Sequence, residues 1–281
     1  MSLRFAYNTN GMGSHRLSDA LTLIAEADYD GVALTLDHCH FDPFDENWYR
    51  NAERLRRDLE RMNLGSVVET GARFLLDPRA KHEPTLVTAS ADGRARRVAF
   101  LKRAIDIAAI LGSEAVSFWA GILKTGFEQE IAWQVLREGL EDVANYAKAK
   151  GVVAALEPEP GMLVETVDDY KRLAAVVLDL TLALDLGHCL VTGEREPAAA
   201  VAEFAGSLGT VAIEDMKRGE HIHLPFGEGD MNIASCLAAL NKIRFSSLVC
   251  VELSRDGHRA DVMVTQALSA LRAYERMAVA A

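Results

Sequence analysis

Cysteine is scarce in this chain, and its few copies lie far apart. Four occur in 281 residues, Cys39, Cys189, Cys236 and Cys250, and no two of them form a Cys-x-x-Cys pair. Such spacing excludes a fold stabilised by a set of disulfide bonds and a structural zinc site with cysteine ligands. We expect these residues to serve as small apolar side chains.

Positive charge and long apolar runs are also lacking. Lys and Arg number 30 against 41 Asp and Glu, so the net charge is −11. Nucleic acids and anionic membranes bind concentrated positive charge, so neither is an expected partner. The sequence has no apolar stretch of membrane-spanning length and no signal-like segment in its first residues. We therefore expect a cytoplasmic protein.

The sequence does contain a regular alternation of two patterns. Short runs of aliphatic and β-branched residues alternate with longer segments whose apolar residues recur at helical spacing. The runs predict strands at 3–7, 32–36, 66–69, 115–118, 152–157, 180–185, 210–214 and 247–252. The longer segments predict helices at 16–28, 47–62, 94–111, 128–149, 166–177, 196–206, 230–241 and 258–278.

This order predicts one α/β domain over residues 1–281, a single (β/α)8 TIM barrel with eight parallel strands. The strand runs are apolar throughout, as in strands buried on both faces. A doubly wound open sheet is the rival fold, but neither a Gly-x-Gly-x-x-Gly turn nor a P-loop is present. The long connection at 70–93 follows the third strand on the face where barrel active sites lie, so it is a candidate lid.

Glycines at predicted helix ends and basic residues on one predicted helix lead to two further expectations. Glycines stand where helices should end in a left-handed conformation, at Gly65, Gly112, Gly151 and Gly209. The basic residues of the helix at 94–111, Arg97 among them, fall mostly off its apolar stripe. We expect them to face solvent.

Acidic residues end four of the predicted strands: Glu69, Glu157, Asp185 and Glu252. In a parallel barrel these ends converge on one face, where carboxylates repel one another. A divalent cation relieves that repulsion, as does a raised pKa on one of the acids. The acids therefore predict a metal site at the mouth of the barrel, although any single one could instead cap a helix or pair with an arginine.

Three histidines follow these acids. His188 comes three residues after Asp185, and His221 and His223 form a His-x-His pair. In an extended segment, residues i and i+2 point the same way, so both imidazoles can reach one ion. A second group, 38–40, has no acid tied to it by spacing, and we interpret it as a cavity wall or a plain loop.

These motifs, taken in order, resemble the xylose-isomerase-like TIM-barrel superfamily, which includes sugar phosphate isomerases and epimerases and endonuclease-IV-type enzymes. The resemblance rests on Glu157-Pro158, the Asp185-Leu-Gly-His188 turn, the segment 223–230 and Val251-Glu252. It implies that Glu157, Asp185 and Glu252 hold a divalent metal. It further implies that Glu157 and Glu252 are the catalytic acid and base, and that His188 and Arg218 contact substrate.

The chain departs from the superfamily at one metal ligand. Alignment on Asp215 places Ala212 where the epimerases carry a metal-binding histidine. Glu214 could complete an all-carboxylate site, which favours Mg²⁺ or Mn²⁺. Alternatively, the metal could shift to His188, His221 and His223, which match a zinc site of the endonuclease-IV-type enzymes. Such a site suits Zn²⁺ or Mn²⁺, and we favour it.

The same comparison disfavours a nuclease. Where those enzymes keep further zinc-binding histidines, this chain has Glu69 and Trp119. We expect both in the substrate site, together with Arg73. The long connection also carries Arg79, Lys81 and His82, which could receive a phosphate or carboxylate as it closes, or could simply keep the loop solvated.

The function that follows is a divalent-metal-dependent isomerase or epimerase of a small sugar, polyol or sugar phosphate. Two glutamates would transfer a proton beside the carbonyl group. A metal-dependent dehydratase and a catalytically lapsed, metabolite-binding barrel are the alternatives. The expected partner is a small carbohydrate. Barrels of this kind often form homo-oligomers, but the sequence marks no interface.

Overall fold

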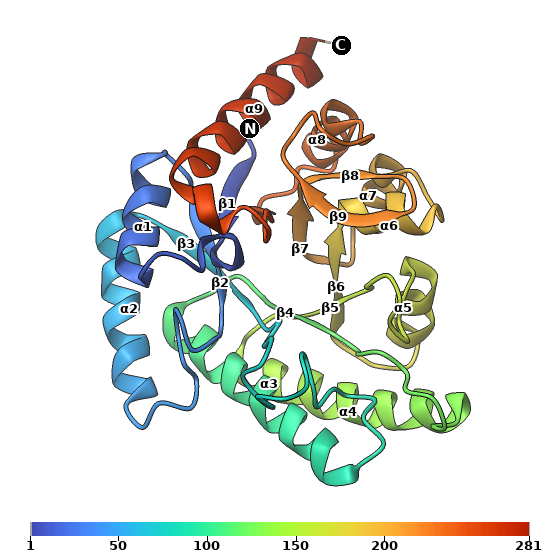
Figure 1. Cartoon of the computed structure of the whole chain (residues 1–281). Helices are drawn as coiled ribbons and strands as arrows, with labels where there is room; N and C mark the ends of the chain where they lie inside the picture. The colour runs from blue at the N-terminus through green and yellow to red at the C-terminus, as the bar shows by residue number, and fades with distance from the viewer. Residues whose placement is uncertain (1, 281) are drawn as a thin grey trace.

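The computed structural model describes residues 2–280 and contains a closed barrel of parallel strands (Figure 1). Its strands are β1 (Arg4–Asn8), β2 (Gly31–Thr35), β3 (Gly65–Glu69), β4 (Val116–Trp119), β5 (Ala154–Glu157), β6 (Leu180–Asp185), β7 (Leu208–Ile213) and β10 (Leu248–Val251). They follow chain order around the barrel, and β10 closes it against β1. The predicted fold class is confirmed.

Helices surround the barrel (Figure 1). They are α1 (Leu17–Glu26), α2 (Trp48–Met62), α3 (Ala91–Leu111), α4 (Gln129–Lys150), α5 (Val167–Ala174), α6 (Leu186–Thr192), α7 (Pro197–Glu203), α8 (Ile233–Lys242) and α9 (Ala260–Ala280), with short 3₁₀ turns at Thr9–Met12 and Gly257–Arg259. Within residues 2–280, no helix is both long enough and apolar enough to cross a membrane.

Two elements near the mouth were not predicted. Helix α6 begins directly at the end of β6, and β8 (Asp215–Lys217) pairs with β9 (Glu220–Leu224) in an antiparallel hairpin. The hairpin packs against α6 (Figure 1). Both lie inside segments treated as connections, because a seven-residue helix and a three-residue strand are too short to show a period.

The strands are buried on both faces, as expected. Along β1, Phe5 and Tyr7 pack in the cluster shared with the surrounding helices, while Ala6 belongs to a separate small cluster with Val67 and Leu248. Successive side chains of a strand point to opposite faces, so Ala6 faces the barrel interior. Asn8, two residues further on, lines the cavity at the mouth.

Two of the four helix-ending glycines were assigned wrongly. Gly112 and Gly151 do end helices in the left-handed region, with φ of 68° and 69°. Gly65 and Gly209 instead lie inside strands β3 and β7. The cause at Gly65 is that Asn63 already adopts the left-handed cap of α2, with φ of 55°.

The helical pattern of apolar residues also predicted the wrong environment for the Arg97 side chain. Its side chain is fully buried rather than solvated. The guanidinium stacks over the ring of Trp119 at 4.3 Å and donates a hydrogen bond to the carbonyl oxygen of Thr70, 3.0 Å away. It therefore links α3 to the start of the long connection.

The long connection spans residues 70–90, because α3 begins three residues earlier than predicted. Its apolar side chains Leu76, Leu86 and Val87 are buried in the core. Closure of this segment as a lid stays a prediction.

Gly209 supplies a test of strand packing. A Cβ atom there would lie 2.3 Å from Oγ1 of Thr181 and 3.0 Å from Cβ of Ala155. Thr181 Oγ1 is held by its bond to the carbonyl of Ala154, so it cannot easily move. We expect Gly209→Ala to lower the free energy of unfolding by roughly 1–3 kcal/mol. The measurement is denaturant unfolding.

Gly206→Ala is the matched control, because a Cβ at Gly206 meets nothing within 4 Å. Equal stability of the two variants would contradict the packing argument.

Candidate active site

A cavity of about 280 Å³ opens at the carboxyl ends of the barrel strands. Most of the predicted site residues line it: Glu69, Arg73, Trp119, Glu157, His188, His221, His223 and Glu252. They come from distant parts of the chain and meet because parallel strands end at one face.

Three predicted residues do not line the cavity. Asp185 and Glu214 are buried beside it. Arg218 lies in the turn of the β8–β9 hairpin, where its guanidinium pairs with Glu196 at 2.6 Å and its N–H donates to Asp230. The structure thus does not bring Arg218 together with the other substrate candidates.

Asp185 and His188 share one short helix turn. Asp185 caps α6 by accepting the backbone N–H of His188 at 3.0 Å. Nδ1 of His188 lies 3.0 Å from the carbonyl oxygen of Pro158, which can only accept a hydrogen bond. Nδ1 therefore carries the proton, and the Nε2 lone pair is directed elsewhere. Nε2 lies 3.1 Å from Nε2 of His221 and 3.6 Å from Asp185 Oδ2.

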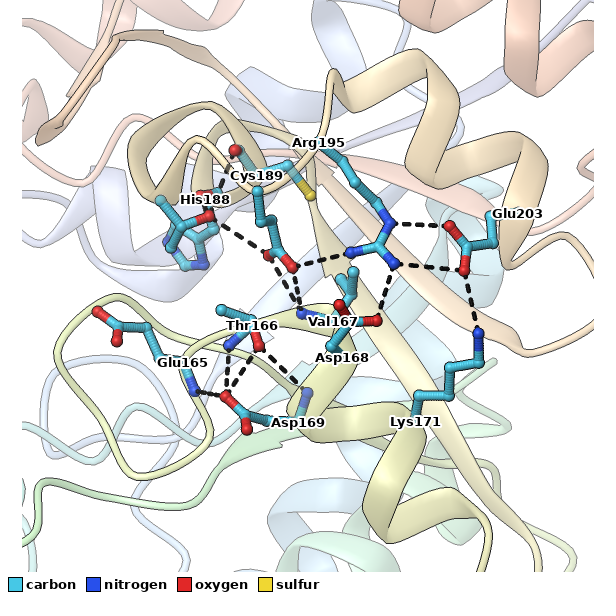
Figure 2. A network of polar contacts seen from close by, with 12 residues as sticks. Glu165, Thr166, Val167, Asp168, Asp169, Lys171, His188, Cys189, Arg195 and Glu203 are labelled. Carbon is cyan, nitrogen blue, oxygen red and sulfur yellow. Dashed lines mark hydrogen bonds and ion pairs between the residues drawn. The ribbon is translucent and has the colours of Figure 1, made fainter.

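A polar network fixes the far end of α6 (Figure 2). Thr192 Oγ1 donates to the carbonyl oxygen of His188 at 3.0 Å and approaches Glu194. The Glu194 carboxylate accepts the N–H of Val167 at the start of α5, and Arg195 pairs with it at 3.2 Å. The backbone of His188 is thereby connected, through Thr192 and Glu194, to the start of α5.

The β8–β9 hairpin carries the other two histidines. His221 and His223 lie two residues apart on β9, with ring centroids 5.6 Å apart, as the extended-segment interpretation predicted. Asp215 at the base accepts the N–H groups of Gly227 and Met231, at 2.8 and 3.1 Å. Asp215 therefore secures the loop that follows the hairpin.

Three groups of side chains in residues 2–280 bring ligand atoms within 4.8 Å of one another. They are His188 with His221 and His223, then Glu157 with Asp185 and His188, and finally Asp185 with His223 and Glu252. The groups overlap, so they form one continuous cluster of candidate metal ligands.

Glu214 belongs to none of these groups and stands behind His223. Its Oε2 lies 3.8 Å from Nδ1 of His223, too far for a hydrogen bond. Neither oxygen of Glu214 has a hydrogen-bond partner among the described residues, and neither do His223 Nδ1 and Asp185 Oδ2. Gly187 permits the close approach of α6, since a Cβ there would lie 2.3 Å from Glu214 Oε1.

Burial and mutual repulsion dominate the electrostatics of the acids. Burial, and then the charge of Glu252, raise the pKa of Glu69 to about 8. Burial and the neighbouring Glu159 raise the pKa of Glu157 well above its usual range. Burial also pushes the pKa of Asp185 upward, but His188 and His223 outweigh it and the pKa is lowered.

The histidines shift in opposite directions. Burial and the nearby His188 lower the pKa of His221 to about 4. Burial alone would lower the pKa of His223 as well. The charges of Glu252 and Glu214 outweigh burial and raise the pKa of His223 to about 10. The cluster thus retains protons where carboxylates crowd together, as expected of a site built for a cation.

Sequence reasoning missed several residues of this cavity, among them Asn10, Glu159 and Arg255. Glu159 lies 3.7 Å from His221 Nε2, and its signal was its place two residues after Glu157. Asn10 donates from Nδ2 to Glu252 Oε1 at 2.8 Å. Asn10 lies in the 3₁₀ turn after β1 and Arg255 lies in the loop after β10, and neither segment is long enough for a periodic pattern to mark the direction of a side chain.

A family model described as xylose isomerase-like TIM barrel matches residues 21–274. The chain belongs to the xylose isomerase-like TIM-barrel family. No curated protein matches its sequence.

Several solved structures share this xylose isomerase-like barrel. An L-ribulose 3-epimerase superposes with a TM-score of 0.78 at 19% identity, covering 99% of this chain and 96% of that one. The IolI protein with a bound zinc atom gives 0.75 at 17% identity, with coverage of 99% and 98%. The probable 3-DHS dehydratase AsbF from Bacillus anthracis gives 0.76 at 15% identity, with coverage of 96% and 99%.

The acid cluster predicts how stability of the cation-free xylose isomerase-like barrel depends on pH. Between pH 6.5 and 8 the folded chain keeps protons on Glu69 and His223, whose pKa values of about 8 and 10 lie above their ordinary 4.5 and 6.5. The unfolded chain has released them, so raising the pH across this window lowers stability. We expect Tm in chelator to fall from pH 6.5 to 8.

Glu69→Gln should flatten this fall, because the amide cannot ionise. Glu46→Gln, at an exposed position, is the control and should follow the wild type. A Tm that rises across the window would refute the interpretation.

Proposed function

We propose that the protein is a divalent-metal-dependent isomerase or epimerase of a small sugar, polyol or sugar phosphate. The observation that carries the proposal is the overlap of imidazole and carboxylate groups around Asp185, buried beside the cavity, and His188, which lines it. Sugar epimerases and a dehydratase are found on the same scaffold, which agrees with the proposed class.

The donor set fits a divalent cation. Asp185 Oδ2 and both oxygens of Glu214 are buried without a hydrogen-bond partner among residues 2–280, which is costly unless a charge compensates them. Mixed nitrogen and oxygen donors suit Zn²⁺ or Mn²⁺, and an all-oxygen set would suit Mg²⁺. A bound cation would polarise the substrate carbonyl and its neighbouring hydroxyl.

The arrangement favours the histidine-rich ligand set. We propose that His188, His221 and His223 hold the cation with Asp185, and that Glu157 and Glu252 complete or flank the site. Glu214 Oε2 lies 3.8 Å from Nδ1 of His223, and Glu214 belongs to none of the three groups of candidate ligands. A carboxylate in that position orients an imidazole ligand instead of binding the metal itself.

We propose that Glu157 and Glu252 exchange a proton with the substrate on opposite faces of it. Glu157 groups with Asp185 and His188, whereas Glu252 groups with Asp185 and His223. Ser117 lies 3.4 Å from Glu157, and Asn10 donates to Glu252. Burial and the neighbouring Glu159 raise the pKa of Glu157, which favours the protonated form that a general acid needs.

A dehydratase would begin with the same proton abstraction, so it shares this machinery. A lapsed barrel that only binds metabolites would not need a cation. Metal content separates the lapsed barrel from either enzyme: we expect about one divalent ion or more per chain after growth in metal-replete medium. Elemental analysis measures the metal content, and an essentially metal-free chain would favour the catalytically lapsed barrel.

The ligand assignment predicts an order of effects. His223→Ala removes a donor atom, whereas Glu214→Ala removes only the group that orients it. Loss of such an orienting group costs about 10–100-fold in metal affinity, and loss of the ligand itself should cost more. Competition with a chelator measures both affinities. A larger loss in Glu214→Ala would instead support the all-carboxylate site.

The proton carriers predict a second result. Glu157→Gln and Glu252→Gln keep the size of the side chain but remove its ability to carry a proton, so each should lower kcat by at least about 100-fold. Far-ultraviolet circular dichroism should show an unchanged fold. Full activity of either variant would remove that residue from the acid–base role.

A further inference from the structure

The cavity has a second, positively charged side that the proposed chemistry does not use. Arg73, Lys81 and Arg255 all line it. Within residues 2–280, neither Lys81 nor Arg255 forms an ion pair or side-chain hydrogen bond. Arg73 makes one contact, a donated bond of 3.3 Å to the carbonyl oxygen of Asn10.

These cations come from two loops on one side of the mouth. Arg73 and Lys81 belong to the connection after β3, and Arg255 follows β10. The histidines approach from another sector, on α6 and the β8–β9 hairpin after β6 and β7. Strands β10, β1, β2 and β3 are consecutive in the barrel, so the cationic loops border a continuous arc.

We infer that the substrate carries an anionic group, a phosphate or a carboxylate, which Arg73, Lys81 and Arg255 bind at the rim of the cavity. This inference rests on the proposed function, which places the reacting carbonyl end of the substrate at Glu157 and Glu252. In a chain of net charge −11, three cations that line one cavity with few protein partners are available to an anionic ligand.

Asn10 connects the two sides of the cavity. Its carbonyl oxygen accepts the bond from Arg73, and its side chain donates to Glu252 at 2.8 Å. An anion at Arg73 is therefore separated from the proposed proton carrier by a single residue. One small ligand can reach both, which matches a cavity slightly smaller than those that hold drug-sized molecules.

The charge of the rim would also orient the ligand. Its three cations attract an anionic end and offer no comparable attraction to an uncharged one. A ligand with one anionic end would therefore enter with its uncharged carbonyl end toward Glu157 and Glu252. Such a fixed orientation is what proton transfer at one particular carbon requires.

Calorimetric titration of the cation-loaded protein tests the inference. The ligands are D-fructose, D-fructose 6-phosphate and D-fructuronate. The last two carry a phosphate or a carboxylate at C6 of the same ketose. We expect one charged ligand to bind at least about tenfold more tightly than D-fructose at low salt, and the difference to shrink as NaCl is raised. The charged ligand with the larger increase in affinity over D-fructose shows whether the site prefers a phosphate or a carboxylate.

Single substitutions test whether the three cations of the rim cause the tighter binding of the charged ligand. Arg73→Ala, Lys81→Ala and Arg255→Ala should each reduce the affinity advantage of the charged ligand over D-fructose by at least about threefold. All three positions are exposed, so the fold should persist, and Tm checks it. Arg79→Ala is the matched control, because Arg79 lies in the same connection without lining the cavity. Equal affinity for charged and uncharged ligands, or an equal loss in Arg79→Ala, overturns the inference.

Inorganic phosphate and the chelator-treated protein separate this inference from the proposed function. The rim needs no metal, so phosphate should still bind the cation-free wild type and bind Arg255→Ala more weakly. A protein that holds no divalent ion yet shows this pattern would refute the proposed enzyme but not the anion site. A protein that holds its cation but binds neither phosphate nor the charged ketoses better than D-fructose would refute the anion site alone.

Discussion

Acidic and imidazole side chains crowd together at one end of this barrel, and much of the local structure depends on that crowding. Burying several carboxylates in one cavity is unfavourable unless protons, imidazolium groups or a cation balance their charge. The raised pKa of Glu69 and the lowered pKa of Asp185 are two responses to the same problem. The first acid keeps a proton, whereas the second is stabilised by neighbouring histidines.

The elements around this cluster serve to hold its side chains in place. Helix α6 is capped by Asp185 itself, so the carboxylate that begins the helix also fixes the backbone of His188. Asp215 organises the loop after the hairpin, and Gly187 allows α6 to approach Glu214 without a steric clash. Residues that never enter the cavity thus determine where its donor atoms lie.

The cavity combines these donors with a cationic rim, and the two sides suit different parts of one ligand. Glu252 receives a hydrogen bond from Asn10, which in turn accepts one from Arg73. Asn10, in the 3₁₀ turn after β1, therefore links the proposed anion site to the proposed proton carrier. The xylose isomerase-like barrel brings these loops together at one end of its strands.

The sequence alone determined the barrel and the acids at its strand ends, because apolar period and strand order are local properties and parallel strands necessarily end at one face. It also placed His221 and His223 on one side of an extended segment. Only the tertiary structure decided that Arg97 is buried, that Arg218 pairs with Glu196 outside the cavity, and that Asn10 reaches Glu252. These facts depend on the direction of side chains in loops and at helix contacts, which packing between distant segments sets and no local pattern records.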